Sequence, residues 1–558
     1  MNFKNIRISS FLLACLLISN PWVSPAAAFQ QSLLSDSTQR KAPENWFNMD
    51  RSANYVPGVS TEKTYEALKN RPSRTIVVAV IDGGVDVQHE DLKSKVWINP
   101  KEVPGNGIDD DKNGYVDDIN GWNFIGGKDG KNVNQDTYEV TREYVRLKKK
   151  YEGIDSSKVK KKDREEFVYF HKVKSEVEKK RNELQQQSEN FRTFYEAYQQ
   201  AKSIVGQALG KENFSLEEMQ ALKTSDDKTK QAKDILMYAM ANSITEEGFK
   251  EAEEYFDKGL KYGYNTEFDP RSTVGDDYAQ LTERFYGNND VTGPDASHGT
   301  HVAGIIAADR NNNLGMKGVA ENVQIMAIRA IPNGDERDKD VANAIRYAVD
   351  NGAHIINMSF GKAFSPHKKI VDAAINYAAS KGVLLVHAAG NDGNNIDTAR
   401  NFPTVKFKTT QKAADEWLEV GASAWKDSLH LAADFSNYGK NTVDVFAPGV
   451  DIYSTAPNQA YKDNSGTSMA APVTSGVAAL LMSYFPNLTA TQVRQIIIRS
   501  TIKYKGLKVD RPGEEEEGQD SMVAFDELSK TGGLINAFEA VKMAEMLSSG
   551  KLSPALNR

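Results

Sequence analysis

Runs of β-branched and aliphatic residues recur along the chain and alternate with amphipathic stretches. The apolar runs cover residues 75–81, 323–328, 355–358 and 383–386. Runs of this length and composition are typical of strands buried on both faces of a parallel sheet. Helical patterns lie beside them, for example at residues 341–349 and 369–379. Because strand and helix alternate, the sequence predicts an α/β fold with a mainly parallel sheet flanked by helices.

A large segment, residues 127–290, interrupts this alternation. It is rich in Lys, Glu and Gln, and from Phe170 to Ala208 its apolar residues follow one another in steps of three and four. Lys180 and Gln187 occupy two positions of this stripe. The spacing predicts a long amphipathic helix of the kind that pairs in a coiled coil.

Two further helices are predicted in the same segment. Ser215 and Glu218 form a capping-box pattern at the start of one, and residues 245–260 have the spacing of the other. We therefore expect a large inserted helical, coiled-coil-like subdomain. Two interpretations stay open, a solvated hairpin that packs on itself and a surface that gates substrate or binds a protein partner.

Polar residues that can carry chemistry follow the predicted strands directly. Asp82 ends the first run, Ser359 follows the third, and Asn391 lies just beyond the fourth. Because the carboxyl ends of parallel strands meet at one edge of a sheet, we expect these side chains to lie at that edge.

Ser468 lies among the small residues of a Gly-Thr-Ser-Met-Ala-Ala-Pro sequence, just before an apolar helical run. Small neighbours leave its hydroxyl unshielded, and the first turn of a helix has unpaired N–H groups that favour negative charge. An alcohol is a weak nucleophile at neutral pH, so it needs a base and a group that orients the base. His298, followed by Gly-Thr-His, and Asp82 supply these residue types. His301, Asp86 and His387 are given no chemical role.

These motifs, in the order Asp82, His298, Asn391 and Ser468, resemble those of the subtilisin-like serine proteases (subtilases). The resemblance implies a catalytic triad of Asp82, His298 and Ser468 and an oxyanion donor at Asn391. It also implies that the backbone of Ser359, Phe360 and Gly361 pairs with substrate by strand addition, and that Ala389 and Gly390 line the adjoining pocket.

Two departures from the family pattern stand out. Asp82 and His298 are 216 residues apart, where subtilases commonly have a few tens, because the helical segment lies between them. The residue after the catalytic Asp is often Ser or Thr, which can donate a hydrogen bond to the carboxylate, and here it is Gly83. Backbone N–H groups or water would have to replace that donor.

An acidic loop at residues 106–118 has the alternating oxygen-bearing residues of a calcium-binding loop. The predicted ligands are Asp109, Asp111, Asn113, Tyr115 (through its carbonyl) and Asp117. The twelfth position is Asn120 rather than Glu, so Asp118 or a residue from elsewhere would have to complete the shell. Related subtilases resemble this chain in such a loop, which favours structural calcium over an acidic turn without metal.

The composition limits the kinds of partner. A chain of 558 residues with a net charge of −7, 40% hydrophobic and 26% charged residues is ordinary for a globular protein. The net charge gives no sign of a basic surface, so nucleic acid is not an expected partner. Protein or peptide substrates are the expected partners.

The first residues have the pattern of an export signal. Lys4 and Arg7 precede an apolar run, and small residues up to Ala28 form a cleavage site. The expected location is therefore periplasmic or secreted. The alternative is a lipoprotein anchored through Cys15, the single cysteine of the chain.

The expected domain order follows from these boundaries: signal peptide 1–28, N-terminal extension 29–70, protease domain 71–126, helical insertion 127–290, protease domain 291–545 and tail 546–558. The expected function is an exported serine endopeptidase that acts through an acyl-enzyme. The alternative is a catalytically weak scaffold or binding protein that acts through the insertion.

Overall fold

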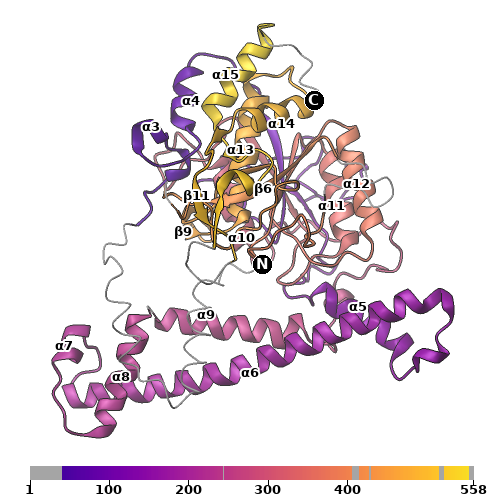
Figure 1. Cartoon of the computed structure of the whole chain (residues 1–558). Helices are drawn as coiled ribbons and strands as arrows, with labels where there is room; N and C mark the ends of the chain where they lie inside the picture. The colour runs from indigo at the N-terminus through magenta and orange to yellow at the C-terminus, as the bar shows by residue number, and fades with distance from the viewer. Residues whose placement is uncertain (1–40, 243, 405–413, 427–428, 514–520, 552–558) are drawn as a thin grey trace. The chain divides into compact units, whose positions relative to one another are not determined.

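The structure is a computed structural model of the whole chain (Figure 1). It describes residues 41–551 except 243, 405–413, 427–428 and 514–520. The predicted signal peptide, Cys15 and most of the tail lie outside the described residues. Within the described part, no helix is both long and apolar enough to cross a membrane. The chain forms two compact units, one of residues 42–139 with 269–551 and one of residues 140–268.

The first unit is built on a nine-stranded sheet with the order β10-β13-β7-β6-β5-β4-β1-β3-β2. Every neighbouring pair in this sheet is parallel except β10 with β13. The strands are β1 (Ile76–Asp82), β2 (Gly121–Asn123), β3 (Val323–Arg329), β4 (Ile355–Met358), β5 (Leu384–Ala388), β6 (Trp417–Ser423), β7 (Val445–Pro448), β10 (Ile502–Lys503) and β13 (Gly533–Leu534). The predicted parallel sheet is confirmed, and the four apolar runs form β1, β3, β4 and β5. Two small antiparallel pairs lie outside it, β8 (Ile452–Ala456) with β9 (Ala460–Asn464) and β11 (Lys508–Asp510) with β12 (Met522–Ala524).

Helices cover both faces of this sheet. Figure 1 shows α11 (Asp338–Asp350) and α12 (Lys368–Ser380) together on one side. On the other side lie α10 (Ser297–Ala307), α13 (Thr467–Tyr484) and α14 (Ala490–Arg499), with α15 (Ala537–Ser548) beside α14. Residues 467–483 of α13 are all buried, since the helix is apolar on every side and packs against the central strands. The short helices α3 (Arg51–Asn54) and α4 (Thr61–Ala67) precede β1.

The second unit is helical, as predicted. Its longest element, α6 (Arg164–Leu209), is a single helix of 46 residues that packs against α8 (Asp227–Ala241) and α9 (Glu246–Asp257). α5 (Glu139–Tyr151) precedes it, and α7 (Leu216–Ala221) begins with the predicted capping box at Ser215. The apolar pattern did not predict α8.

The core of the helical unit lies along α6. The ring of Phe249 in α9 lies 4.7 to 5.9 Å from the rings of Phe191, Phe194, Tyr195 and Tyr198 in α6. The apolar stripe of α6 is therefore covered by helices of the same unit. This packing favours the interpretation of a hairpin that packs on itself.

The two segments that lead to and from the helical unit pack within the first unit. Residues 127–139 and 269–290 belong to the first unit, so the compact helical unit is shorter than the predicted insertion of 127–290. Buried ion pairs hold these segments against α11 and the chain after β4: Asp136–Arg337, Arg271–Asp340, Asp276–Lys339 and Glu139–Lys362. Apolar periodicity carries no signal for such pairs, so the sequence analysis did not predict them.

We predict that a fragment of residues 140–268 folds on its own and shows helical circular dichroism with cooperative urea unfolding. Phe249→Ala should lower its free energy of unfolding by about 3–5 kcal/mol, because it removes the ring at the centre of the aromatic core. Val168→Ala, at a side chain that is 68% exposed in α6, is the control and should change it by less than about 0.5 kcal/mol. A random-coil spectrum, or equal effects of the two variants, would contradict this prediction.

Candidate active site

A glycine lets helix α10 approach the end of β1. A Cβ atom on Gly299 would lie 2.2 Å from the carbonyl oxygen of Gly84 and 3.0 Å from Cβ of Asp82. Contacts that short do not occur, so any larger residue would push the helix away from the strand. His298 precedes this glycine in the first turn of α10, and Asp82 is the last residue of β1. The close approach brings these two side chains together.

The carboxylate of Asp82 lies against the imidazole of His298. Nδ1 of His298 is 2.7 Å from Oδ1 and 2.9 Å from Oδ2 of Asp82. The Asp82 side chain is 3% exposed and that of His298 is 21% exposed, so the imidazole alone reaches solvent. Oδ1 of Asp82 also accepts the backbone N–H of Gly83 at 2.7 Å. A backbone donor thus serves the carboxylate that has no neighbouring hydroxyl.

Ser468 lies in the first turn of α13, and Pro472 inside the same helix removes one of its hydrogen bonds. Pro472 has no N–H and therefore cannot donate to the carbonyl of Ser468, its usual acceptor four residues back. The hydroxyl of Ser359 donates to this carbonyl instead, at 2.9 Å. Oγ of Ser468 donates in return to the carbonyl of Ser359 at 3.1 Å. The candidate nucleophile is therefore joined directly to the chain that follows β4.

The side chain of Asn391 is oriented by Thr467, the residue before Ser468. Oδ1 of Asn391 accepts the backbone N–H of Thr467 at 2.8 Å and its hydroxyl at 2.9 Å. The oxygen and nitrogen of an amide diverge from the same carbon, so these bonds direct Nδ2 of Asn391 away from Thr467. The hydroxyl of Thr467 also accepts the N–H of Gly390 at 3.1 Å. One threonine thus fastens the loop after β5 to the start of α13.

Two asparagines that the sequence analysis missed shape the predicted pocket. Asn437 donates to the carbonyl of Ala389 and accepts the N–H of Asn394 at 2.7 Å. Asn401 donates to the same carbonyl at 2.9 Å. A Cβ atom on Gly361 would lie only 2.3 Å from Oδ1 of Asn401. The side chain of Asn401 therefore lies against both Gly361 and Ala389. No local pattern distinguishes these asparagines from ordinary turn residues.

Buried charged and titratable residues surround the Asp82 end of β1. Arg329, the last residue of β3, is 1% exposed and donates from Nε to the carbonyl of Gly83 at 2.7 Å. Burial lowers the pKa of Arg329 to about 10. His301 is fully buried with Nε2 3.0 Å from the carbonyl of Lys462, and burial lowers its pKa to about 3. His301 is thus neutral near pH 7 and packs as a core residue.

Comparison with known proteins agrees with this arrangement. The family model described as the subtilase family matches residues 73–525, which is most of the chain. The chain belongs to the subtilase family.

Several characterised subtilases are similar to it. A thermophilic serine proteinase of Bacillus sp. (strain AK1) is 43% identical over 211 residues, 38% of this chain and 48% of that protein. Thermitase of Thermoactinomyces vulgaris is 40% identical over 221 residues, 39% of this chain and 72% of thermitase. A cell wall-associated protease of Bacillus subtilis (strain 168) is 33% identical over 275 residues, 48% of this chain and 28% of that protein. The chain thus spans about half or less of two of these relatives.

The acidic loop of this subtilase brings some of its predicted ligands together with one that was missed. Carboxylate oxygens of Glu102, Asp109 and Asp111 lie within 4.8 Å of one another. Glu102 is 7% exposed, and its Oε2 has no hydrogen-bond partner among the described residues. A buried carboxylate oxygen without a donor is costly, and a cation would satisfy it.

The side chains of the other predicted ligands make hydrogen bonds and ring contacts within the protein. Oδ1 of Asp117 accepts the N–H of Gly105, and Oδ2 accepts that of Gly107, both at 2.8 Å, so this carboxylate organises the turn. The amide nitrogen of Asn113 donates to Asp111 and Asp118. The ring of Tyr115 is buried against Trp122 and Tyr347, and its carbonyl stays the predicted ligand atom. Glu102 precedes the loop and carries no spacing signal, so the sequence alone did not identify it.

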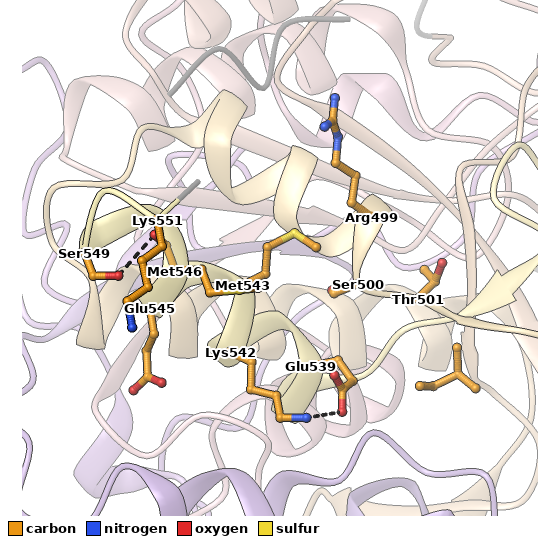
Figure 2. Close-up of a pocket in the computed structure, with 11 residues that line it drawn as sticks. Arg499, Ser500, Thr501, Glu539, Lys542, Met543, Glu545, Met546, Ser549 and Lys551 are labelled. Atoms are coloured by element: carbon orange, nitrogen blue, oxygen red, sulfur yellow. Dashed lines mark hydrogen bonds and ion pairs between the residues drawn. The ribbon is translucent and has the colours of Figure 1, made fainter. Parts of the chain in front are cut away.

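A hollow of about 800 Å³ between α14 and α15 lies apart from these groups. Figure 2 shows Arg499, Lys542 and Glu545 among the residues that line it. Lys542 is paired with Glu539 at 2.9 Å. None of its lining residues is a predicted site residue, so the candidate active site is defined by its chemistry and not by this hollow.

Proposed function

We propose that this protein is an exported serine endopeptidase that hydrolyses peptide bonds through Asp82, His298 and Ser468. The observation that carries the proposal is the 2.7 Å contact between Nδ1 of His298 and the buried carboxylate of Asp82, which ends β1. Ser468 is hydrogen-bonded to Ser359 just after β4, the strand paired with β1. Membership of the subtilase family and similarity to thermitase support it.

The proposed reaction assigns one role to each side chain. His298 accepts the hydroxyl proton of Ser468 during attack on the scissile carbonyl and returns it to the leaving amine. Asp82 holds the imidazole with its Nδ1 protonated and offsets the positive charge that forms on it. Water then hydrolyses the acyl-enzyme by the same steps in reverse order.

The tetrahedral intermediate requires donors to its oxyanion. Nδ2 of Asn391, directed away from Thr467, and the backbone N–H of Ser468 are the proposed donors. Substrate would extend along Ser359, Phe360 and Gly361 by strand addition, with the preceding side chain near Ala389 and Gly390. The two hydrogen bonds between Ser359 and Ser468 support this assignment, because they fix the position of the substrate-pairing segment relative to the nucleophile.

Export and structural calcium complete the proposal. Export is supported by the signal-like residues 1–28, and a cell wall-associated protease is among the relatives. The anchor at Cys15 remains the alternative. Glu102, Asp109 and Asp111 would hold a calcium ion, whose positive charge would stabilise the loop that precedes β2. We further propose that the helical unit acts mainly as a self-packed appendage, with a partner-binding role as the alternative.

The first prediction concerns the nucleophile. Ser468→Ala should abolish hydrolysis of casein and leave the melting temperature near that of the wild type, because the hydroxyl group is removed and the helix is kept. A fluorophosphonate probe should label the wild type and not the variant. Undiminished activity of the variant would refute the assignment, and an inactive, unlabelled wild type would favour the scaffold alternative.

The second prediction concerns the oxyanion. Asn391→Ala should lower kcat by about 10²–10³ with little change in KM, since this contact strengthens only in the transition state. Asn394→Ala, in the same loop, is the control, because its side chain has no proposed role. A rise in KM without a fall in kcat would show that Asn391 binds substrate and does not stabilise the oxyanion.

The third prediction concerns calcium, measured in the Ser468→Ala background to exclude self-digestion. Calcium at one hundred times its Kd should stabilise the protein by roughly 2.7 kcal/mol relative to chelator. Glu102→Gln should remove most of this difference, whereas Asp129→Asn, at an exposed ion pair, should leave it intact. Equal melting temperatures in calcium and chelator would exclude the site.

A further inference from the structure

His387, which carries no role in the proposed reaction, is buried between two hydrogen-bond acceptors. Its side chain is fully buried in β5. Nε2 lies 2.9 Å from the carbonyl oxygen of Phe360, and Nδ1 lies 2.9 Å from Oε1 of Glu419 in β6. Phe360 belongs to the edge that is proposed to pair with substrate. The buried pair of His387 and Glu419 thus contacts this segment through the carbonyl of Phe360.

The hydrogen bond from the side chain of His387 takes the place of a backbone hydrogen bond between β4 and β5. The parallel pairing of β4 with β5 ends at Met358 opposite His387. The next residue of β5's chain, Ala389, donates its N–H to the carbonyl of Val420 in β6 at 3.0 Å and not to the chain after β4. The carbonyl of Phe360, two residues past the last pair, therefore receives its hydrogen bond from the side chain of His387.

The two acceptors determine where the protons lie. A carbonyl oxygen can only accept, so Nε2 of His387 must carry a proton. Nδ1 faces a carboxyl group, which requires a second proton between Nδ1 and Glu419. His89 is a useful contrast, because it is equally buried and its Nε2 lies 3.1 Å from the carbonyl of Ala460, yet its Nδ1 accepts the N–H of Asp91. Nδ1 of His89 thus accepts a backbone N–H, whereas Nδ1 of His387 shares a proton with a carboxyl group.

Further contacts hold Glu419 in place. Its Oε2 accepts the indole N–H of Trp417 at 2.8 Å, and the Trp417 ring lies 5.1 Å from the His387 ring. The Glu419 side chain is 4% exposed. Burying the polar side chains of His387 and Glu419 costs desolvation, so their hydrogen bonds at the carbonyl of Phe360 point to a role in positioning.

The backbone N–H and carbonyl of Gly361 face away from His387. In extended chain, the backbone groups of neighbouring residues point to opposite sides. The carbonyl of Phe360 points inward to His387, so the N–H and carbonyl of Gly361 point outward. Within the described residues no group bonds to the N–H or carbonyl of Gly361. Gly361 thus offers the paired donor and acceptor that an added peptide strand needs.

We propose that His387 is a positioning residue, which with Glu419 fixes the Phe360 peptide group so that Gly361 is presented to an extended peptide substrate. The inference rests on the proposed function, and it attributes to His387 the preference of the protease for longer peptide substrates. It implies that His387 contributes to binding of residues that precede the scissile bond and not to the chemical step at Ser468.

The test compares peptide p-nitroanilides with one and with four residues before the scissile bond, using the full chain. The double variant His387→Phe, Glu419→Gln removes the Nε2 donor and also the carboxyl group that would otherwise lose its partner. Its ratio of kcat/KM for the long over the short substrate should fall roughly tenfold, the value of one hydrogen bond. The fall should lie in KM, with kcat for the short substrate unchanged.

Two further variants separate positioning from general stability. Glu419→Gln alone keeps the Nε2 donor, so its ratio should fall less than that of the double variant. His89→Gln, the matched buried histidine away from the edge, should leave the ratio unchanged even where it lowers the melting temperature. An unchanged ratio in the folded double variant, an equal loss on both substrates, or an equal loss in His89→Gln would overturn the proposal.

Failure of the proposal can be told from failure of the proposed function. If Ser468→Ala abolishes hydrolysis and the double variant keeps the wild-type ratio, the protease assignment stands and the role of His387 is wrong. If the wild type hydrolyses neither substrate and is not labelled by fluorophosphonate, the proposed function itself is wrong, and the role of His387 falls with it.

Discussion

The close approach of α10 to the end of β1 is the constraint on which the geometry of the site depends. Gly299 allows it, because any side chain there would collide with the backbone of Gly84. The approach places His298 within hydrogen-bond distance of Asp82 although more than two hundred residues separate them in the chain. The same helix packs against α13, which carries Ser468. One small residue therefore sets the distance between the elements that carry Asp82 and His298.

The large separation of Asp82 and His298 has little structural cost, because the helical unit has its own core. Aromatic side chains of α6 and α9 bury one another within residues 140–268. The segments at its ends are fixed within the first unit by buried ion pairs such as Asp136–Arg337 and Glu139–Lys362. A pair of this kind is sensitive to loss of one partner, so it specifies one arrangement of those segments.

Buried polar side chains hold the backbone around the candidate site. Arg329 holds the carbonyl of Gly83, Asn437 holds that of Ala389, and His387 holds that of Phe360. In each case the acceptor lies just past the end of a strand, where ladder hydrogen bonds stop. Side chains from neighbouring strands or loops complete the hydrogen bonding there and keep the loops in one conformation.

The sequence by itself determined the parallel sheet, the long helix α6, and the identity of the triad candidates and Asn391. These features are local, since apolar runs, helical spacing and short motifs are each contained within a few residues. Only the tertiary structure decided that Glu102 joins Asp109 and Asp111, and that the segments flanking the helical unit belong to the first unit. The partnership of His387 with Phe360 and Glu419 was equally invisible, because it joins three separate parts of the chain. Hydrogen bonds and ion pairs between distant residues depend on the packing of strands and helices, and no periodicity in the sequence records them.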